Sequence, residues 1–88
     1  MNLRFSGLLL RLVDYERTMQ IDAPTLGDAV AVAEQRHPRL RPVLRDGEGR
    51  LRRSHRIFIN GDLAPTADLT TPLGPADDVE FLTAITGG

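Results

Sequence analysis

The order of hydrophobic and polar positions predicts two strands in the first quarter of the chain. Apolar Leu3 and Phe5 alternate with polar neighbours, which is the period of a strand with one buried face. Met19 and Ile21 show the same alternation. The run from Leu8 to Tyr15 between them is too apolar for a free loop, so we expect it to continue or cap the first strand.

The clearest helix is predicted between Pro24 and Pro38. Thr25 can cap its first turn, and Asp28 lies near the positive end of the helix dipole. The apolar residues of this segment recur at helical spacing: Leu26, Ala29, Val30 and Ala33. Gly27 weakens the first turn, and Pro38 ends the helix because proline cannot continue it.

The second half of the chain predicts a connector, a loop and the remaining strands. RLRPVL, residues 39–44, is typical of an irregular or short helical connector, and DGEGR, residues 46–50, of a loop. RIFINGD, residues 56–62, predicts a strand with a tight turn at Asn60-Gly61. The last strand should run from Asp78 to about Ala84. This order predicts an α+β domain in which one main helix packs across a mixed sheet of four to five strands.

Two apolar residues are predicted on the sheet face that points away from the helix. Alternation along each strand places Phe58 and Leu82 opposite to the residues that face the helix, and Ala84 and Thr86 follow Leu82 on the same face. Apolar groups gathered on one face often mark a contact surface. We therefore predict that Phe58, Leu82, Ala84 and Thr86 bind a partner. The alternatives are that a loop covers these residues or that the two faces are inverted.

Composition narrows the classes of protein that fit this pattern. With 88 residues, 41% of them hydrophobic and 26% charged, the chain suits one globular domain with a single core. It has no cysteine, which excludes disulfides, thiolate metal sites and a cysteine nucleophile. His37 and His55 lack a third ligand at metal-like spacing, and both are expected to be surface or connector residues. Asp77 and Asp78 are expected to be turn residues, so no catalytic or metal site is predicted.

The basic residues are unevenly distributed along the chain, although the net charge is only −1. All eleven are arginine, and eight of them lie between Arg36 and Arg56. Arginine favours phosphate contacts, but the cluster lacks interleaved aromatic residues, so a solvated face or a docking surface for an acidic partner is favoured over nucleic acid. Because the chain has no lysine, its own side chains cannot accept an acyl group at an amine.

No membrane partner is predicted, and the protein is expected to be cytoplasmic. The longest apolar run, GLLLRLV at residues 7–13, is interrupted by Arg11 and is far shorter than a signal-peptide core with its flanks or a membrane span.

The chain ends in FLTAITGG, residues 81–88, in which an apolar and β-prone run stops at two glycines. We expect residues 1–84 to form the domain and residues 85–88 a flexible tail. Glycine has no Cβ, so Gly87 and Gly88 can pass through a narrow site and adopt positive φ. The hypothesis that follows is that the Gly88 carboxylate is the functional group. The alternative is an incidental tail, because chain ends tolerate many sequences.

The second half of the chain resembles a known family. RIFINGDLA followed by LTTPLGPADDVEFL, with Gly-Gly at the end, is similar to the ThiS/MoaD-type ubiquitin-like sulfur carriers, whose element order is that of the β-grasp fold. The connector DGEGRLRR, residues 46–53, looks like that of members nearer the MoaD and cysteine-pathway carriers. Thr83 stands where proline is frequent in molybdopterin-synthase small subunits, which leaves the pathway open.

The resemblance implies a β-grasp protein carrier without a bound cofactor, which is not itself an enzyme, although it could be the small subunit of a sulfur-transfer synthase. A separate activating enzyme would use ATP to adenylate Gly88, with Gly87 allowing the tail to enter the site. Conversion to a thiocarboxylate would then supply a downstream synthase with sulfur for cofactor, cysteine or natural-product biosynthesis. The alternatives are a ubiquitin-like modifier conjugated to lysines of other proteins, or an arginine-rich β-grasp binding module.

Overall fold

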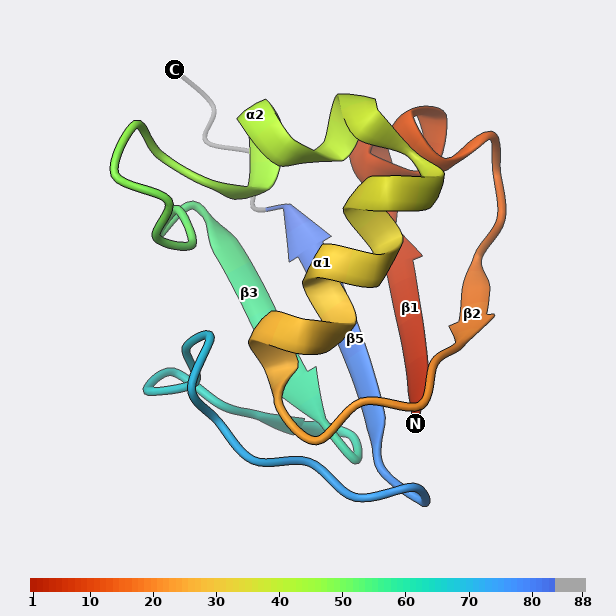
Figure 1. The fold of residues 1–88 in the computed structure, drawn as a ribbon, viewed down its shortest axis with the longest axis vertical. Coiled ribbons are helices and arrows are strands. Elements are labelled where there is room, and N and C mark those ends of the chain that lie inside the picture. The colour runs from red at the N-terminus through yellow and green to blue at the C-terminus, as the bar shows by residue number, and fades with distance from the viewer. Residues whose placement is uncertain (84–88) are drawn as a thin grey trace.

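The computed structural model, which describes residues 1–83, has a layer of helices packed on a five-stranded sheet (Figure 1). The strands are β1 (Asn2–Ser6), β2 (Thr18–Gln20), β3 (His55–Ile59), β4 (Asp62–Leu63) and β5 (Asp78–Thr83). The helical elements are the 3₁₀ helices η1 (Gly7–Val13) and η2 (Pro38–Leu40) and the α-helices α1 (Leu26–Arg36) and α2 (Arg41–Leu44).

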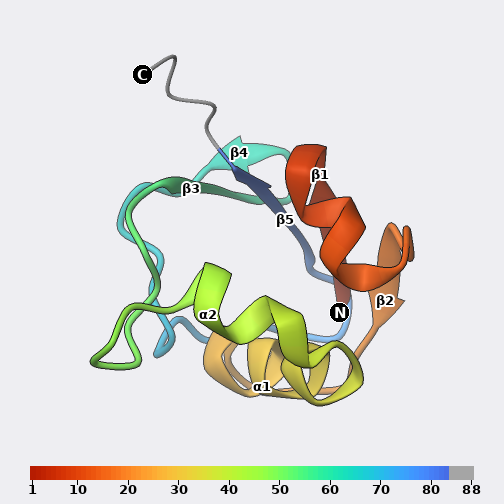
Figure 2. The same ribbon diagram turned by 90° about the horizontal axis from the view of Figure 1, so that it is seen from above.

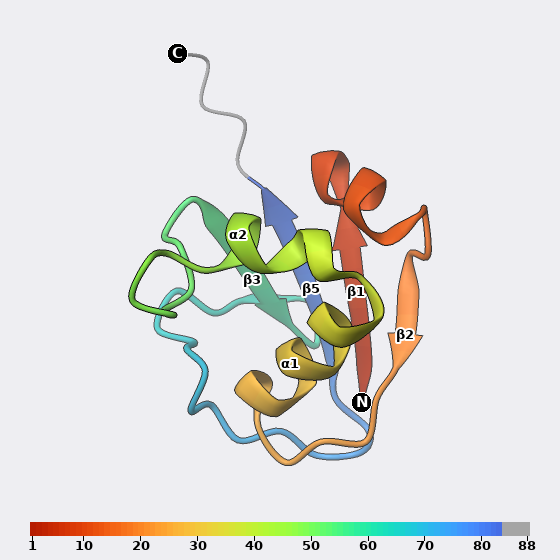
Figure 3. The same ribbon diagram turned by 45° about the horizontal axis from the view of Figure 1, so that its top comes forward.

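The sheet is mixed, with strand order β2-β1-β5-β3-β4. The first and last strands, β1 and β5, are parallel neighbours, whereas β2, β3 and β4 pair antiparallel with their neighbours. Helix α1 crosses one face of this sheet (Figure 3), and α2 lies on the same side (Figure 2). This is the β-grasp arrangement, so the predicted fold class is confirmed.

The hydrophobic core lies between α1 and the inner face of the sheet. Every apolar residue that the sequence assigned to the inner face of α1 is buried: Leu26, Ala29, Val30 and Ala33. Phe5 and Phe81 face each other across the parallel pair, with ring centroids 5.7 Å apart. Burying a side chain of this size contributes about 1.5–3 kcal/mol to stability. The core therefore fixes the two central strands against the helix.

The start of α1 is capped as predicted. The Asp28 N–H donates to Thr25 Oγ1 at 3.2 Å, which satisfies one of the unpaired amides of the first turn. The Gly27 N–H donates to the Leu69 carbonyl at 2.8 Å, and a Cβ on Gly27 would lie only 2.6 Å from that oxygen. Gly27 is thus required by the close approach of the chain at Leu69.

The prediction that Leu8–Tyr15 continues or caps the first strand is wrong. Gly7, with φ of 64°, turns the chain out of β1, and residues 7–13 then form η1. Leu9 and Val13 of this helix are buried, while Leu8 is 57% exposed. Asp14, with φ of 51°, ends the helix in the left-handed region. A helical turn therefore buries the apolar run without extending the sheet.

The connector and the tight turn form as predicted. Elements η2 and α2 carry Leu40 and Leu44 into the core, where both are fully buried. Asn60 and Gly61 join β3 to β4 with φ of 53° and 85°, the backbone geometry that favours these two residue types.

Candidate functional site

The predicted site is built around the end of β5, where the described chain stops at Thr83. Strand β5 pairs with β1 from Asp78 to Leu82 and with β3 from Val79 to Thr83. Leu82 is thus held from both sides in β5, the central strand of the sheet. Gly87, Gly88, Ala84 and Thr86, together with the predicted domain limit at residue 84, lie outside the described residues. The roles assigned to them stay predictions.

Phe58 and Leu82 lie on the face of the sheet away from α1, here called the outer face. Phe58 pairs with Glu80 and Leu82 with Arg56, so the two apolar side chains are diagonal neighbours on adjacent strands. Both are half-buried. The start of η1 covers part of Leu82, since a Cβ on Gly7 would lie 3.6 Å from Leu82 Cδ1. The predicted placement is therefore confirmed, while binding to a partner stays a prediction.

Leu63 extends this apolar surface and was missed from the sequence. It pairs with Phe58 across the β3–β4 hairpin and is 51% exposed. The signal was present, because a two-residue turn at Asn60-Gly61 places the second residue after the turn opposite the second residue before it. Leu63, Phe58 and Leu82 form what we call the apolar strip, which crosses β4, β3 and β5.

The other half of the outer face is polar. The Ser6 hydroxyl donates to the Glu80 carboxylate, and Asn2 Nδ2 donates to Asp78 Oδ1 at 2.8 Å. The Arg4 guanidinium lies 3.9 Å from Asp78 Oδ1. These contacts join β1 to β5 and leave the apolar strip as the part of the outer face with exposed hydrocarbon.

His55 fixes the end of β5 and is not the surface or connector residue that the sequence predicted. It is 9% exposed and pairs with Thr83 in the ladder. Its Nε2 lies 2.8 Å from the Val43 carbonyl oxygen, which can only accept, so this nitrogen carries the proton. In the neutral ring Nδ1 is then an acceptor, and it lies 3.4 Å from Thr83 Oγ1. His55 thus links the end of β5 to α2.

Asp77 is a turn residue, as predicted, and it lies just before the start of β5, at the opposite end of that strand from Thr83. Asn60 Nδ2 donates to Asp77 Oδ1 at 3.0 Å, and the Gly74 N–H donates to Asp77 Oδ2 at 2.7 Å. These hydrogen bonds, that of Asn60 first, lower the pKa of Asp77 below its usual value. The carboxylate therefore stays ionised and braces the loop.

Within residues 1–83, no three side chains of His, Cys, Asp or Glu converge as metal ligands would. None of the helices in that part of the chain is long and apolar enough to cross a membrane.

Comparison with known proteins gives a family match over most of the chain. The model of the ThiS family matches residues 9–88. Searching the curated proteins gives no match.

Solved structures with the same fold cover nearly the whole chain. SAMP1 from Haloferax volcanii superimposes with a TM-score of 0.85 at 23% identity, over 100% of this chain and 98% of that one. A chain of the Amycolatopsis orientalis BexX/CysO complex gives a TM-score of 0.84 at 19% identity, over 99% and 98% of the two chains. CysO from Mycobacterium tuberculosis gives 0.81 at 21% identity, over 96% and 98%.

Proposed function

The chain belongs to the ThiS family of small ubiquitin-like carriers and modifiers, and on that premise we propose that it carries sulfur as a thiocarboxylate at Gly88. The observation that carries this proposal is that the family match runs through Gly87 and Gly88. The fold supports it, because β5 is the central strand and holds Leu82, six residues before Gly88, between β1 and β3.

The chemistry requires activation, because a carboxylate would have to expel oxide to transfer its acyl group. In the proposed first step, an oxygen of the Gly88 carboxylate attacks the α-phosphorus of ATP and pyrophosphate leaves. Hydrosulfide from a sulfur donor then attacks the carbonyl carbon of the acyl adenylate. AMP departs, the remaining proton goes to solvent, and Gly88 becomes a thiocarboxylate. Both steps take place in partner enzymes, and the protein described here supplies the acyl group.

Gly87 gives the tail the freedom to enter such an enzyme. A residue with no Cβ can pass through a channel that a branched side chain would block, and it can adopt positive φ. The rest of the chain adds no competing nucleophile of the amine or thiol type from its side chains, because it has neither lysine nor cysteine. We propose that the acyl adenylate therefore persists until the sulfur donor attacks it, because no amine or thiol side chain of the chain can capture it.

The proposed partners are an activating enzyme, which adenylates and thiolates Gly88, and a synthase that accepts the sulfur. We assign their contact surface to the apolar strip of Leu63, Phe58 and Leu82, which lies on β5 and its neighbours. Binding of a partner to half-buried Phe58 and Leu82 should cost little conformational entropy, because β3 and β5 already hold these residues in place. A chain of the BexX/CysO complex has this fold, which supports a role in which the carrier is bound by a partner protein.

The test is ATP–pyrophosphate exchange with a candidate activating enzyme. We expect exchange with the full chain, and a loss of about a hundredfold or more when Gly88 is deleted or Gly87→Val blocks the tail, since misplacing a reacting group by about 1 Å costs that much. Gly47→Val is the matched control, because a Cβ at Gly47 meets no atom within 4 Å. Circular dichroism should show that all variants fold.

Retention of exchange after Gly88 is deleted would refute the proposal. If instead the adenylated chain is recovered in amide linkage to lysines of other proteins, the protein is a modifier and sulfur transfer is not its role.

A further inference from the structure

An open groove of about 520 Å³ begins where β3 starts, and we call it the arginine groove. Its apolar lining residues, here called its floor, include Leu51, Ile57 and Leu63. Three arginines also line it, Arg52, Arg53 and Arg56, and are here called its rim. The groove is therefore amphipathic.

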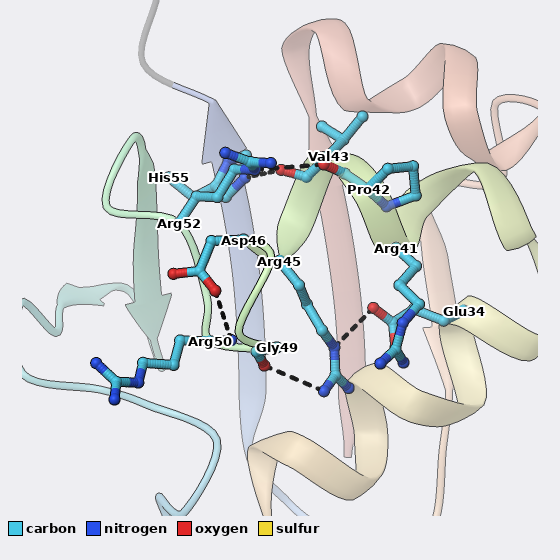
Figure 4. A network of polar contacts seen from close by, with 10 residues as sticks. All are labelled: Glu34, Arg41, Pro42, Val43, Arg45, Asp46, Gly49, Arg50, Arg52 and His55. Atoms are coloured by element: carbon cyan, nitrogen blue, oxygen red, sulfur yellow. Dashed lines mark hydrogen bonds and ion pairs between the residues drawn. The ribbon is translucent and has the colours of Figure 1, made fainter.

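The rim arginines differ from Arg41, Arg45 and Arg50 of the cluster, each of which makes an ion pair. Arg45 Nε contacts Glu34 Oε2 (Figure 4) at a distance of 2.9 Å, and Arg50 lies 3.5 Å from Glu48. Within residues 1–83, by contrast, Arg52, Arg53 and Arg56 make no ion pair. All three are exposed, and Arg52 Nε donates to the Pro42 carbonyl at 3.3 Å, which orients that side chain.

The charge of this part of the chain is also unbalanced. Residues 36–56 contain eight arginines and only two acidic residues, Asp46 and Glu48, which leaves six positive charges in excess. Such a field attracts a negatively charged partner and speeds its encounter.

A free strand edge runs along the groove. Strand β4 pairs only with Phe58 and Ile59, and the Ala64 N–H donates to the Ile57 carbonyl at 2.8 Å. Before Ile57, no strand of the described chain lies on this side of β3, so the edge is open at His55, whose N–H donates to the Arg52 carbonyl at 3.4 Å. The main-chain groups of Arg56 face β5 instead. An extended segment can add to such an edge through main-chain hydrogen bonds, while alternate side chains enter pockets. The open edge is short, so the side-chain contacts must supply most of the affinity.

We propose that the arginine groove receives an extended, acidic segment of the activating enzyme, with one apolar side chain on the floor and carboxylates at the rim. His55 pairs with Thr83, so the groove lies beside the end of β5. A segment bound there would hold the carrier while its last residues reach the enzyme. The identity of the partner rests on the proposed function, whereas the preference for an acidic and apolar segment rests on the groove alone.

The groove fits such a segment better than it fits a nucleic acid. Binding to single strands relies on aromatic side chains that stack on bases. No aromatic residue lines the groove, and its hydrocarbon floor offers no partner to a phosphate or a sugar.

The first experiment measures peptide binding to the full chain by fluorescence anisotropy and ¹⁵N–¹H NMR. The probes are a labelled Glu-Asp-Leu-Glu-Asp peptide, its neutral counterpart Gln-Asn-Leu-Gln-Asn, the apolar-deficient Glu-Asp-Ser-Glu-Asp and an oligothymidylate. We expect the first peptide to bind most tightly, with NMR shifts at Leu51, Arg53, Arg56 and Leu63. Tighter binding of the oligothymidylate, equal binding of the serine peptide, or no binding of any peptide would each overturn the proposal.

Matched charge reversals test the rim. Arg53→Glu/Arg56→Glu should weaken the acidic peptide about five- to thirty-fold, the effect expected from losing two exposed ion pairs. Arg36→Glu/Arg39→Glu changes the net charge equally at exposed positions outside the groove and should have less than a twofold effect. Equal effects of the two double variants would mean that net charge alone explains the binding of the acidic peptide, which would overturn the proposal.

Two further measurements separate this proposal from that of the preceding section. In pyrophosphate exchange, Arg53→Glu/Arg56→Glu should raise KM for the carrier and leave kcat unchanged. Peptide binding without any pyrophosphate exchange would contradict the sulfur-carrier proposal but not the groove proposal. Exchange in which Arg53→Glu/Arg56→Glu leaves KM unchanged would contradict the groove proposal but not the sulfur-carrier proposal. Light scattering that showed a dimer abolished by Arg53→Glu/Arg56→Glu would assign the groove to a second copy of the chain instead.

Discussion

At the scale of single residues, Gly27 shows how tertiary contact can reverse a judgement based on helix propensity. By propensity alone, glycine in the first turn costs α1 about 1 kcal/mol relative to alanine. In the fold, the Gly27 N–H bonds the Leu69 carbonyl, and the backbone there approaches too closely for a Cβ. The sequence identifies the weak turn but not the segment that packs on it, because residues 27 and 69 are far apart along the chain.

Gly27→Ala should therefore destabilise the protein, although alanine is the better helix former. A Cβ placed 2.6 Å from a backbone oxygen must displace one of the two segments, and overpacking of this kind costs about 1–3 kcal/mol. Urea unfolding monitored by circular dichroism measures the change, with Gly47→Ala as a control that should stay within about 0.5 kcal/mol of the parent. A Gly27→Ala protein as stable as the parent would show that the Leu69 segment moves freely.

At the scale of elements, the sequence predicts those whose signals are local. Thr25, the helical spacing that follows it and the Asn60-Gly61 turn define α1 and the β3–β4 hairpin before any tertiary contact is known. The segment of η1 has no such signal, because an unbroken apolar run can be buried by a strand or by a helical turn. The positive φ angles of Gly7 and Asp14 make the run a 3₁₀ helix instead of a strand. These angles depend on how the run packs against β5.

Helix α1 and the connector after it are joined by an ion pair that the sequence does not reveal. The Glu34 side chain is only 6% exposed, and it lies 2.9 Å from Arg45 and 3.7 Å from Arg41. Arg45 also donates to the Gly49 carbonyl, so one guanidinium connects the helix to the loop (Figure 4). Part of the arginine cluster is thus structural, and only the rim arginines belong to the proposed contact with a partner.

Arg45→Ala should cost about 3 kcal/mol of stability, because it leaves the buried Glu34 carboxylate without its closest partner. Arg41→Ala removes a guanidinium that is 63% exposed, and it should cost less than about 1 kcal/mol. Thermal unfolding of the two variants gives the comparison directly, since about 1 kcal/mol shifts Tm by 4–8 °C in a domain of this size. Similar Tm shifts for the two variants would mean that Arg41 or water stabilises the Glu34 carboxylate as well as Arg45 does.

At the scale of the whole molecule, the fold follows from the sequence, whereas much of the surface chemistry does not. Alternation correctly places Phe58 and Leu82 on the outer face. Other features depend on which loops meet in space. They are the exposure of Leu63, the burial of His55 and the difference between arginines that make ion pairs and arginines that do not. The central hypothesis concerns Gly87 and Gly88. Their proposed role depends on reactions that partner enzymes carry out.

In the proposed function, the sheet presents one acyl group and two contact surfaces. The apolar strip crosses the outer face beside the end of β5, and the arginine groove opens at the neighbouring start of β3. The two surfaces share Leu63 and both include part of β3, which pairs with β5. A partner bound to either surface would therefore be positioned relative to β5.

The measurement that tests the central claim most directly is alkylation after activation. The protein is incubated with ATP, a competent activating enzyme and sulfide, then treated with iodoacetamide and mapped by mass spectrometry. Because the chain has no cysteine, a thiocarboxylate would be its only sulfur nucleophile of the thiol type, and stable carbamidomethylation should map to Gly88. The absence of both an AMP adduct and a label at Gly88, with an enzyme shown to be competent, would contradict the claim and favour a binding module.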